Sequence, residues 1–184
     1  LILVFLIYTD ISSATAQTAI AVIPEEPTYS FNEQILFAAQ IQPVEPVDEV
    51  LLLIQIGGEG GQVKVIEANI DEHGKVTATL DLKEAPLRAF SRIEYWYQVV
   101  PLEGEVYTGP HFSFEYEDNR FEWKTLSGAP FRVFWYEGDL AFAQEVLNVA
   151  YAALPHIQEI LEVYLPDSLR IYVYRNASEM QAAL

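Results

Sequence analysis

Residues 112–139 contain the change of pattern that decides the fold. They begin with Phe112-Ser113-Phe114-Glu115-Tyr116, in which aromatic and polar residues alternate. A short charged linker, Glu117-Asp118-Asn119-Arg120, follows, and then Phe131-Arg132-Val133-Phe134-Trp135-Tyr136 leads to Gly138-Asp139. Alternation with a period of two is typical of strands that bury one face. Beyond Asp139 the apolar residues recur every three or four positions, which predicts a helix. The pattern therefore divides the chain near residue 120.

The region before residue 117 is expected to be entirely β. Runs of β-branched, leucine and aromatic residues recur there, separated by turn signals. They lie at residues 35–41, 50–56, 63–70, 76–82, 93–100, 106–108 and 112–116. Six or seven strands within about 100 residues are typical of an immunoglobulin-like or fibronectin-like β-sandwich. Residues 50–56 are almost continuously apolar, which predicts a central strand buried on both faces.

Two loops of this region carry glycine where the backbone needs a positive φ angle. Residues 57–61 read Gly-Gly-Glu-Gly-Gly and connect two strands, so they do not match a phosphate-binding loop that opens a helix. Residues 71–75 are predicted to form a hairpin loop with Gly74 in the left-handed conformation.

The region after residue 120 is expected to be an incomplete α/β segment with the order β-α-β-α. Strands are predicted at residues 131–136 and 169–174, on either side of an amphipathic helix that starts after Asp139 and runs to residue 164. Pro155 should kink or divide that helix. Asn176, with Glu179 three residues later, resembles a capping box opening a second helix. Such a unit leaves one sheet face and two sheet edges uncovered, so the domain is expected to be truncated.

The amino-terminal residues 1–16 resemble a partial secretory signal peptide. Residues 1–8 are all apolar, and Ala14-Thr15-Ala16 fits a signal-peptidase site. The apolar run is too short to span a bilayer, so no membrane span is expected beyond this segment. A buried amino-terminal strand is the alternative. We therefore expect a secreted or extracytoplasmic protein with three parts: residues 1–16, a sandwich at 17–117, and the α/β segment at 118–184.

Composition excludes several functional classes. The net charge of −17 with only 10 Lys and Arg residues argues against a nucleic-acid partner. This acidity favours solubility, and a cationic partner or divalent ions are the alternative. The chain has no cysteine, which excludes disulfides, thiol nucleophiles and cysteine-ligated zinc.

No residue set in the sequence supports catalysis, so we assign no catalytic, cofactor-binding or metal residue. His73, His111 and His156 lack metal-ligand spacing, and no H-E-x-x-H or G-x-S-x-G motif occurs. The adjacent acids at 117–118 are expected to be solvated. The aromatic groups at 95–97 and 134–136 are expected to be core, with a carbohydrate-stacking platform as the alternative.

From residue 121 onward the chain resembles the opening of the peptidase MA-like domain, a family of exported bacterial zinc metallopeptidases of the gluzincin type. The resemblance rests on residues 121–126, on 131–139 with the phrase Trp135-Tyr136-Glu137-Gly138-Asp139, and on 171–174 and 180–184. It implies a zinc site built from an H-E-x-x-H helix and a downstream glutamate, and a peptide or protein substrate. Because that motif is not in these residues, zinc is expected in the full-length protein and not in this chain. The strands at 131–136 and 169–174 would then be scaffold.

The alternative is a non-enzymatic secreted or cell-surface protein that uses the sandwich to contact a protein or glycan.

Overall fold

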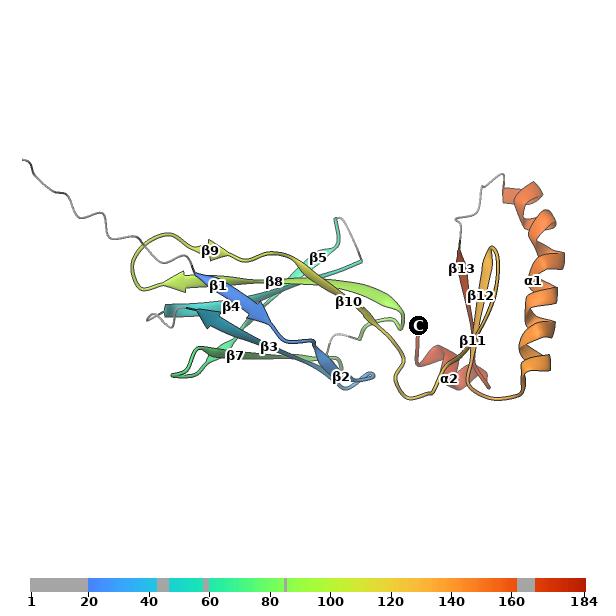
Figure 1. Ribbon diagram of the computed structural model, residues 1–184, viewed down its shortest axis with the longest axis horizontal. Coiled ribbons are helices and arrows are strands. Elements are labelled where there is room, and N and C mark those ends of the chain that lie inside the picture. The colour runs from blue at the N-terminus through green and yellow to red at the C-terminus, as the bar shows by residue number, and fades with distance from the viewer. Residues whose placement is uncertain (1–19, 43–46, 58–59, 85, 162–167) are drawn as a thin grey trace, which may run out of the picture.

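The computed structural model describes residues 20–42, 47–57, 60–84, 86–161 and 168–184. Within them it shows a β-sandwich followed by a smaller unit of three strands and two helices (Figure 1). The expected signal segment, residues 1–16, lies outside the described residues. In the part of the chain that is described, no helix is both long and apolar enough to cross a membrane.

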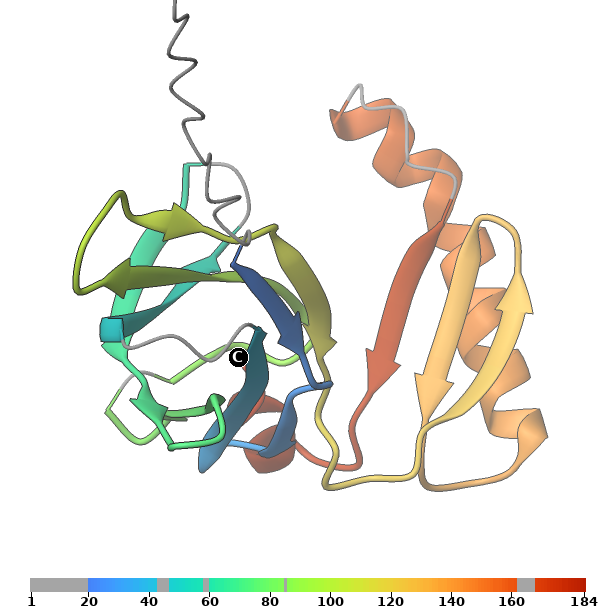
Figure 2. The ribbon, with the colours of Figure 1, turned by 60° about the vertical axis from the view of Figure 1, so that its left-hand side comes forward.

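The sandwich consists of two antiparallel sheets that face each other (Figures 1 and 2). The first has the order β1-β3-β7-β6, with β2 paired to β3, and comprises β1 (Ala21–Pro24), β2 (Thr28–Ser30), β3 (Gln34–Gln42), β6 (Asn69–Ile70) and β7 (Lys75–Asp81). The second has the order β10-β8-β4-β5, with β9 paired to β8, and comprises β4 (Val47–Ile56), β5 (Gln62–Glu67), β8 (Ser91–Pro101), β9 (Tyr107–Thr108) and β10 (Phe112–Tyr116). The predicted all-β sandwich is therefore present.

The sandwich core follows the two-residue period of the sequence. In β8, Ile93, Tyr95, Tyr97 and Val99 are all buried, as their shared face predicts. Alternate residues of β3, β4 and β7 meet them from both sheets in one hydrophobic cluster. Burial of alternate apolar residues on two facing sheets is the main stabilising contribution of such a fold.

The prediction that residues 50–56 are buried on both faces is wrong. Val50, Leu52 and Ile54 are buried, but Leu51 and Leu53 are only half-buried. These two residues point to the outer face of the second sheet, over which no further layer lies in the described residues.

The run at residues 63–70 also differs from its prediction as one strand. It divides into β5 in the second sheet and β6 in the first, and the backbone N–H of Ala68, between them, donates to the carbonyl of Val50 at 2.8 Å. The short strands β1 and β2 were not among the predicted runs.

The predicted hairpin at residues 71–75 is confirmed. Gly74 has φ of +78°, and the side chain of Asp71 accepts hydrogen bonds from the backbone N–H groups of His73 and Lys75, each at 2.9 Å. In the loop at 57–61, Gly57 and Gly60 have φ of +90° and +85°, while residues 58–59 lie outside the described residues.

The smaller unit is a three-stranded sheet with the order β11-β12-β13. It comprises β11 (Lys124–Gly128), β12 (Phe131–Trp135), α1 (Leu140–Leu161), β13 (Leu169–Val173) and α2 (Ala177–Gln181). β12 and β13 are parallel, an arrangement that requires a crossover connection, which α1 supplies, and β11 pairs antiparallel with β12. β11 was not predicted, because Leu126 is its only large apolar residue.

Helix α1 begins as predicted, because the side chain of Asp139 accepts a hydrogen bond from the backbone N–H of Phe142 at 3.0 Å. Of the two outcomes expected at Pro155, a kink or a division of the helix, the division does not occur, since α1 continues through it to Leu161. Pro155 lies on an exposed stretch of the helix, where water can bond the carbonyl that loses its partner. The predicted end of the helix, residues 162–166, lies outside the described residues.

The two faces of the small sheet contact different parts of the molecule. On one face Phe131, Val133 and Trp135 pack against Ala143 and Leu147 of α1, which lies on the side away from the sandwich (Figure 1). The opposite face carries Phe134 and Tyr172, whose rings stack at 4.5 Å, and Tyr172 also stacks on Phe90 of the sandwich at 3.4 Å. The expectation that this face is uncovered therefore holds only in part, because Phe134 and Tyr172 are half-buried whereas Arg132 and Arg170 are exposed.

Gly128, at the end of β11, lies directly under α1. A Cβ at this position would lie 2.5 Å from the Tyr151 hydroxyl oxygen and 2.8 Å from Leu147 Cδ2. We expect Gly128→Val to lower the free energy of unfolding by about 1–3 kcal/mol, as overpacked cores do. Urea denaturation would measure this. Ser127→Val, at the exposed neighbouring strand position, is the control and should change stability little; equal effects of the two variants would contradict the close packing.

Candidate functional site

The three histidines considered in the sequence analysis lie on different elements of the structure. His73 is exposed in its hairpin, and His156 is exposed on α1. The ring of His111 stacks on Trp96 at 4.2 Å, and its Nδ1 lies 2.8 Å from Glu94 Oε1. Across the described ranges, no three His, Asp or Glu side chains are arranged to hold a metal ion.

The aromatic groups are core, as expected. Tyr95 and Tyr97 are buried inside the sandwich, and Trp96, on the outer face, is covered by His111. Trp135 is buried under α1, whereas Phe134 and Tyr136 join the aromatic cluster on the other sheet face. Neither group forms an open stacking platform.

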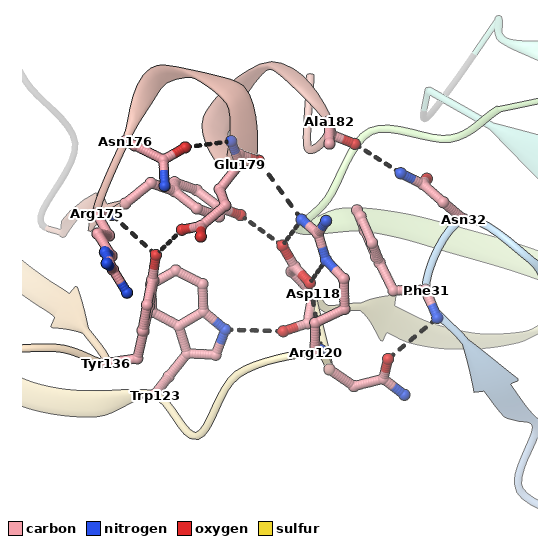
Figure 3. Close-up of polar contacts among 12 residues, drawn as sticks. Phe31, Asn32, Asp118, Arg120, Trp123, Tyr136, Arg175, Asn176, Glu179 and Ala182 are labelled. Atoms are coloured by element: carbon pink, nitrogen blue, oxygen red, sulfur yellow. Dashed lines mark hydrogen bonds and ion pairs between the residues drawn. The ribbon is translucent and has the colours of Figure 1, made fainter.

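The most densely bonded polar cluster lies at the junction of the two units (Figure 3). Its centre is Asp118, which is 0% exposed and is the one buried charged residue in the described part of the chain. Arg120 binds its carboxylate with two hydrogen bonds, Nε to Oδ1 at 2.8 Å and a terminal nitrogen to Oδ2 at 2.6 Å. Tyr174 donates to Oδ2 at 3.0 Å, and Trp123 Nε1 donates to the Asp118 carbonyl at 2.9 Å. The prediction that the acid at 118 is solvated is therefore wrong.

The electrostatics of this cluster favour one protonation state. The hydrogen bond between Arg120 and Asp118 is the main cause of the raised pKa of the Arg120 guanidinium. Burial, followed by the nearby Asp118 charge, raises the pKa of the Tyr174 hydroxyl well above its ordinary value. Arg120 therefore stays charged and Tyr174 stays neutral. The cluster of Asp118, Arg120, Trp123 and Tyr174 is a joint, because its hydrogen bonds connect the linker to the small unit.

Helix α2 extends the joint into the sandwich. Its cap is half of the expected box: Asn176 accepts from the backbone N–H of Glu179 at 3.0 Å, but the Glu179 carboxylate accepts from the Tyr136 hydroxyl instead of returning to the cap. Beyond the helix, the Ala182 carbonyl accepts from the Asn32 side chain at 2.6 Å (Figure 3). Ala183 is 4% exposed and belongs to the sandwich core.

A hollow of about 430 Å³ lies beside the joint. It is bounded by the carboxyl ends of β12 and β13 and by the start of α1, the place where α/β sheets commonly bind ligands. Its lining includes Glu137, Asp139, Phe142, Val173, Tyr174 and Arg175. Arg175 and Glu137 form an ion pair at 3.4 Å, and Asp139 already caps α1. The lining offers charged and apolar contacts.

Buried tyrosines make stability sensitive to high pH. Burial raises the pKa of Tyr97, whose hydroxyl has no hydrogen-bond partner in the described structure. A raised folded-state pKa means that the neutral form is favoured, so its contribution is complete below pH 10, the ordinary tyrosine value, and is lost as the pH rises further. We expect a loss of about 1.4 kcal/mol per pH unit from this residue above that point.

Tyr97→Phe should therefore match the wild type at pH 8 and lose less stability at pH 11 in urea denaturation. Tyr107→Phe, at a half-buried position of the same sheet, is the control. Identical pH profiles of wild type and Tyr97→Phe would contradict the assignment.

Comparisons with known proteins give no family. No protein-family model and no curated protein sequence matches the chain. Solved structures align at low similarity. One is a β-1,3-glucan-binding domain of carbohydrate-binding module family 56, with TM-score 0.35, 14% identity, and 50% of this chain and 96% of that chain covered. Another is the sensor domain of the anti-sigma factor RsgI4 of Pseudobacteroides cellulosolvens, with TM-score 0.38, 10% identity, and coverage of 54% and 76%.

A third is catalytically inactive OgpA of Akkermansia muciniphila in complex with an O-glycopeptide substrate, with TM-score 0.38, 16% identity, and coverage of 53% and 28%. Similarity at this level assigns neither family nor function.

Proposed function

We propose that this chain is the amino-terminal portion of an exported zinc metallopeptidase of the peptidase MA-like type. In this proposal an immunoglobulin-like or fibronectin-like accessory sandwich precedes the scaffold strands of the peptidase domain. The resemblance of residues 121–126, 131–139, 171–174 and 180–184 supports the proposal, and the amino-terminal signal-like segment supports export.

The structural observation that supports the proposal is that one edge of β13 has no strand partner in the described residues. β13 is parallel to β12 and connected to it through α1. Its residues Leu169, Ile171 and Val173 are half-buried on the α1 side. Parallel strands are usually covered on both faces and paired on both edges, so β13 is built to lie inside a larger sheet. A peptidase domain that continues this sheet would supply the missing neighbour.

The zinc site of such a peptidase does not fit the residues described. The three histidines lie on a sandwich hairpin, a sandwich strand end and α1, and none has a second imidazole beside it. We therefore derive no catalytic step from this chain. Its role in the proposal is to hold the sandwich in a fixed position relative to the peptidase sheet, through the joint around Asp118.

Metal analysis and a cleavage assay test the proposal. The product of the complete gene should contain one zinc per molecule and cleave an unstructured protein such as casein, and chelation should stop the cleavage. The 184-residue chain is expected to hold no stoichiometric zinc and to cleave nothing. Stoichiometric zinc in the 184-residue chain, or none in the complete product, would overturn the proposal.

A second candidate, non-enzymatic binding through the sandwich, has its own observation. Val63 and Val65 of β5 are 44% and 54% exposed on the outer face of the second sheet, beside the half-buried Leu53. An exposed apolar sheet face suits contact with a protein or glycan. If this candidate is right, Val65→Lys should abolish retention of the chain on immobilised polysaccharide or on its protein partner, while folding is unchanged by circular dichroism.

A further inference from the structure

Helix α1 is apolar on two different faces. Its inner face, with Ala143 and Leu147, is buried against the small sheet. On its outward side, Phe142, Val149 and Ile160 are 39%, 68% and 67% exposed. Single exposed apolar residues are ordinary, but a continuous set on one helix face indicates a contact surface.

These exposed residues, together with the half-buried Ala153, form one continuous stripe. Phe142, Val149, Ala153 and Ile160 follow one another at intervals of seven, four and seven residues, and Ile157 borders them at 43% exposure. These five residues define the outer stripe. Such spacing keeps side chains in line along a helix, and the stripe extends over about 27 Å. Intervals of four and seven residues separate the a and d positions of a heptad, the positions through which one α-helix packs on another.

The charges around the stripe indicate the kind of helix that fits it. Helix α1 contains Glu145 and Glu159 and has no Lys or Arg, and its last turn has no basic residue to offset the negative end of the helix dipole. In a second copy packed antiparallel, Glu145 of one helix would approach Glu159 of the other, and the two chains would each carry a net charge of −17. A partner with Lys and Arg beside its apolar face would meet complementary charge near both ends of the stripe, at Glu145 and at Glu159.

We propose that the outer stripe of α1 docks an amphipathic α-helix of a partner protein whose apolar face is flanked by Lys and Arg. This inference does not depend on the peptidase proposal. Burial of the stripe would supply the affinity, and the carboxylates of Glu145 and Glu159 would select for the basic rim.

Fluorescence anisotropy with labelled synthetic helices tests the docking. The probe is a peptide of about three heptads with Leu at positions a and d and Lys at e and g. One control peptide has Glu in place of Lys, and a second has the composition of the probe in a scrambled order that is not amphipathic. The 184-residue chain should bind the probe at least about tenfold more tightly than either control. Equal binding of the probe and the scrambled peptide would show only general attraction to an acidic protein, and would overturn the proposal.

Two sets of chain variants complete the test. The double variant Val149→Lys with Ile160→Lys changes exposed positions only and should lose at least about tenfold in affinity for the probe. The double variant Glu145→Lys with Glu159→Lys should shift the preference to the acidic peptide. Unchanged binding by the first variant would contradict the proposal. A wild-type dimer in size-exclusion chromatography that the first variant disperses would also contradict it, because the occupant would then be a second copy.

Discussion

Replacing Asp118 with alanine is expected to lower the free energy of unfolding by about 3 kcal/mol, the lower end of the range for breaking a buried ion pair. The substitution leaves the Arg120 guanidinium and the Tyr174 hydroxyl without their shared acceptor. The lower end applies because the side chain of Arg120 is 34% exposed and water can partly replace the carboxylate. Urea denaturation, followed by tryptophan fluorescence, would measure the change.

Two variants make the Asp118 result specific. Asp118→Asn keeps an oxygen acceptor for Tyr174 but loses the charge, so its effect should be intermediate. Asp48→Ala removes an exposed carboxylate of the sandwich and should alter stability by less than about 0.5 kcal/mol. If Asp118→Ala costs no more than Asp48→Ala, the cluster does not join the two units.

The second large effect is expected at Trp135, which is 4% exposed between β12 and α1. Trp135→Ala should cost about 3–5 kcal/mol, because it leaves a large cavity under the helix. Trp135→Phe should cost clearly less, since the indole Nε1 is buried without a hydrogen-bond partner in the described structure and its loss breaks no bond. The same denaturation experiment distinguishes the variants, and an equally large loss for both would show that the indole N–H has a partner.

Patterns with a local cause were predicted well from the sequence. The alternation in β8 identified its buried face, and the Asp139 cap identified the start of α1. The hairpin at 71–75 followed from Gly74, and the structure adds the hydrogen bonds that Asp71 accepts within the turn. In each case the deciding interaction lies within a few residues of the chain.

Features set by distant residues could not be predicted in this way. Asp118 is buried because Tyr174, 56 positions later, and Trp123 close over it, so its neighbours in the sequence give no sign of burial. Whether the second face of residues 50–56 is buried depends on whether another layer covers the sheet, and the local sequence does not indicate this. The outer stripe of α1 was missed because its residues and those of the inner face are both apolar, and only the sheet position separates them.

Sequencing the gene beyond the codon for Leu184 would test the proposal that the chain is the front of a zinc metallopeptidase. We expect an open frame that encodes H-E-x-x-H on a helix-forming stretch within about 150 residues, followed by a further glutamate ligand. A frame that continues for that length without paired histidines would contradict it.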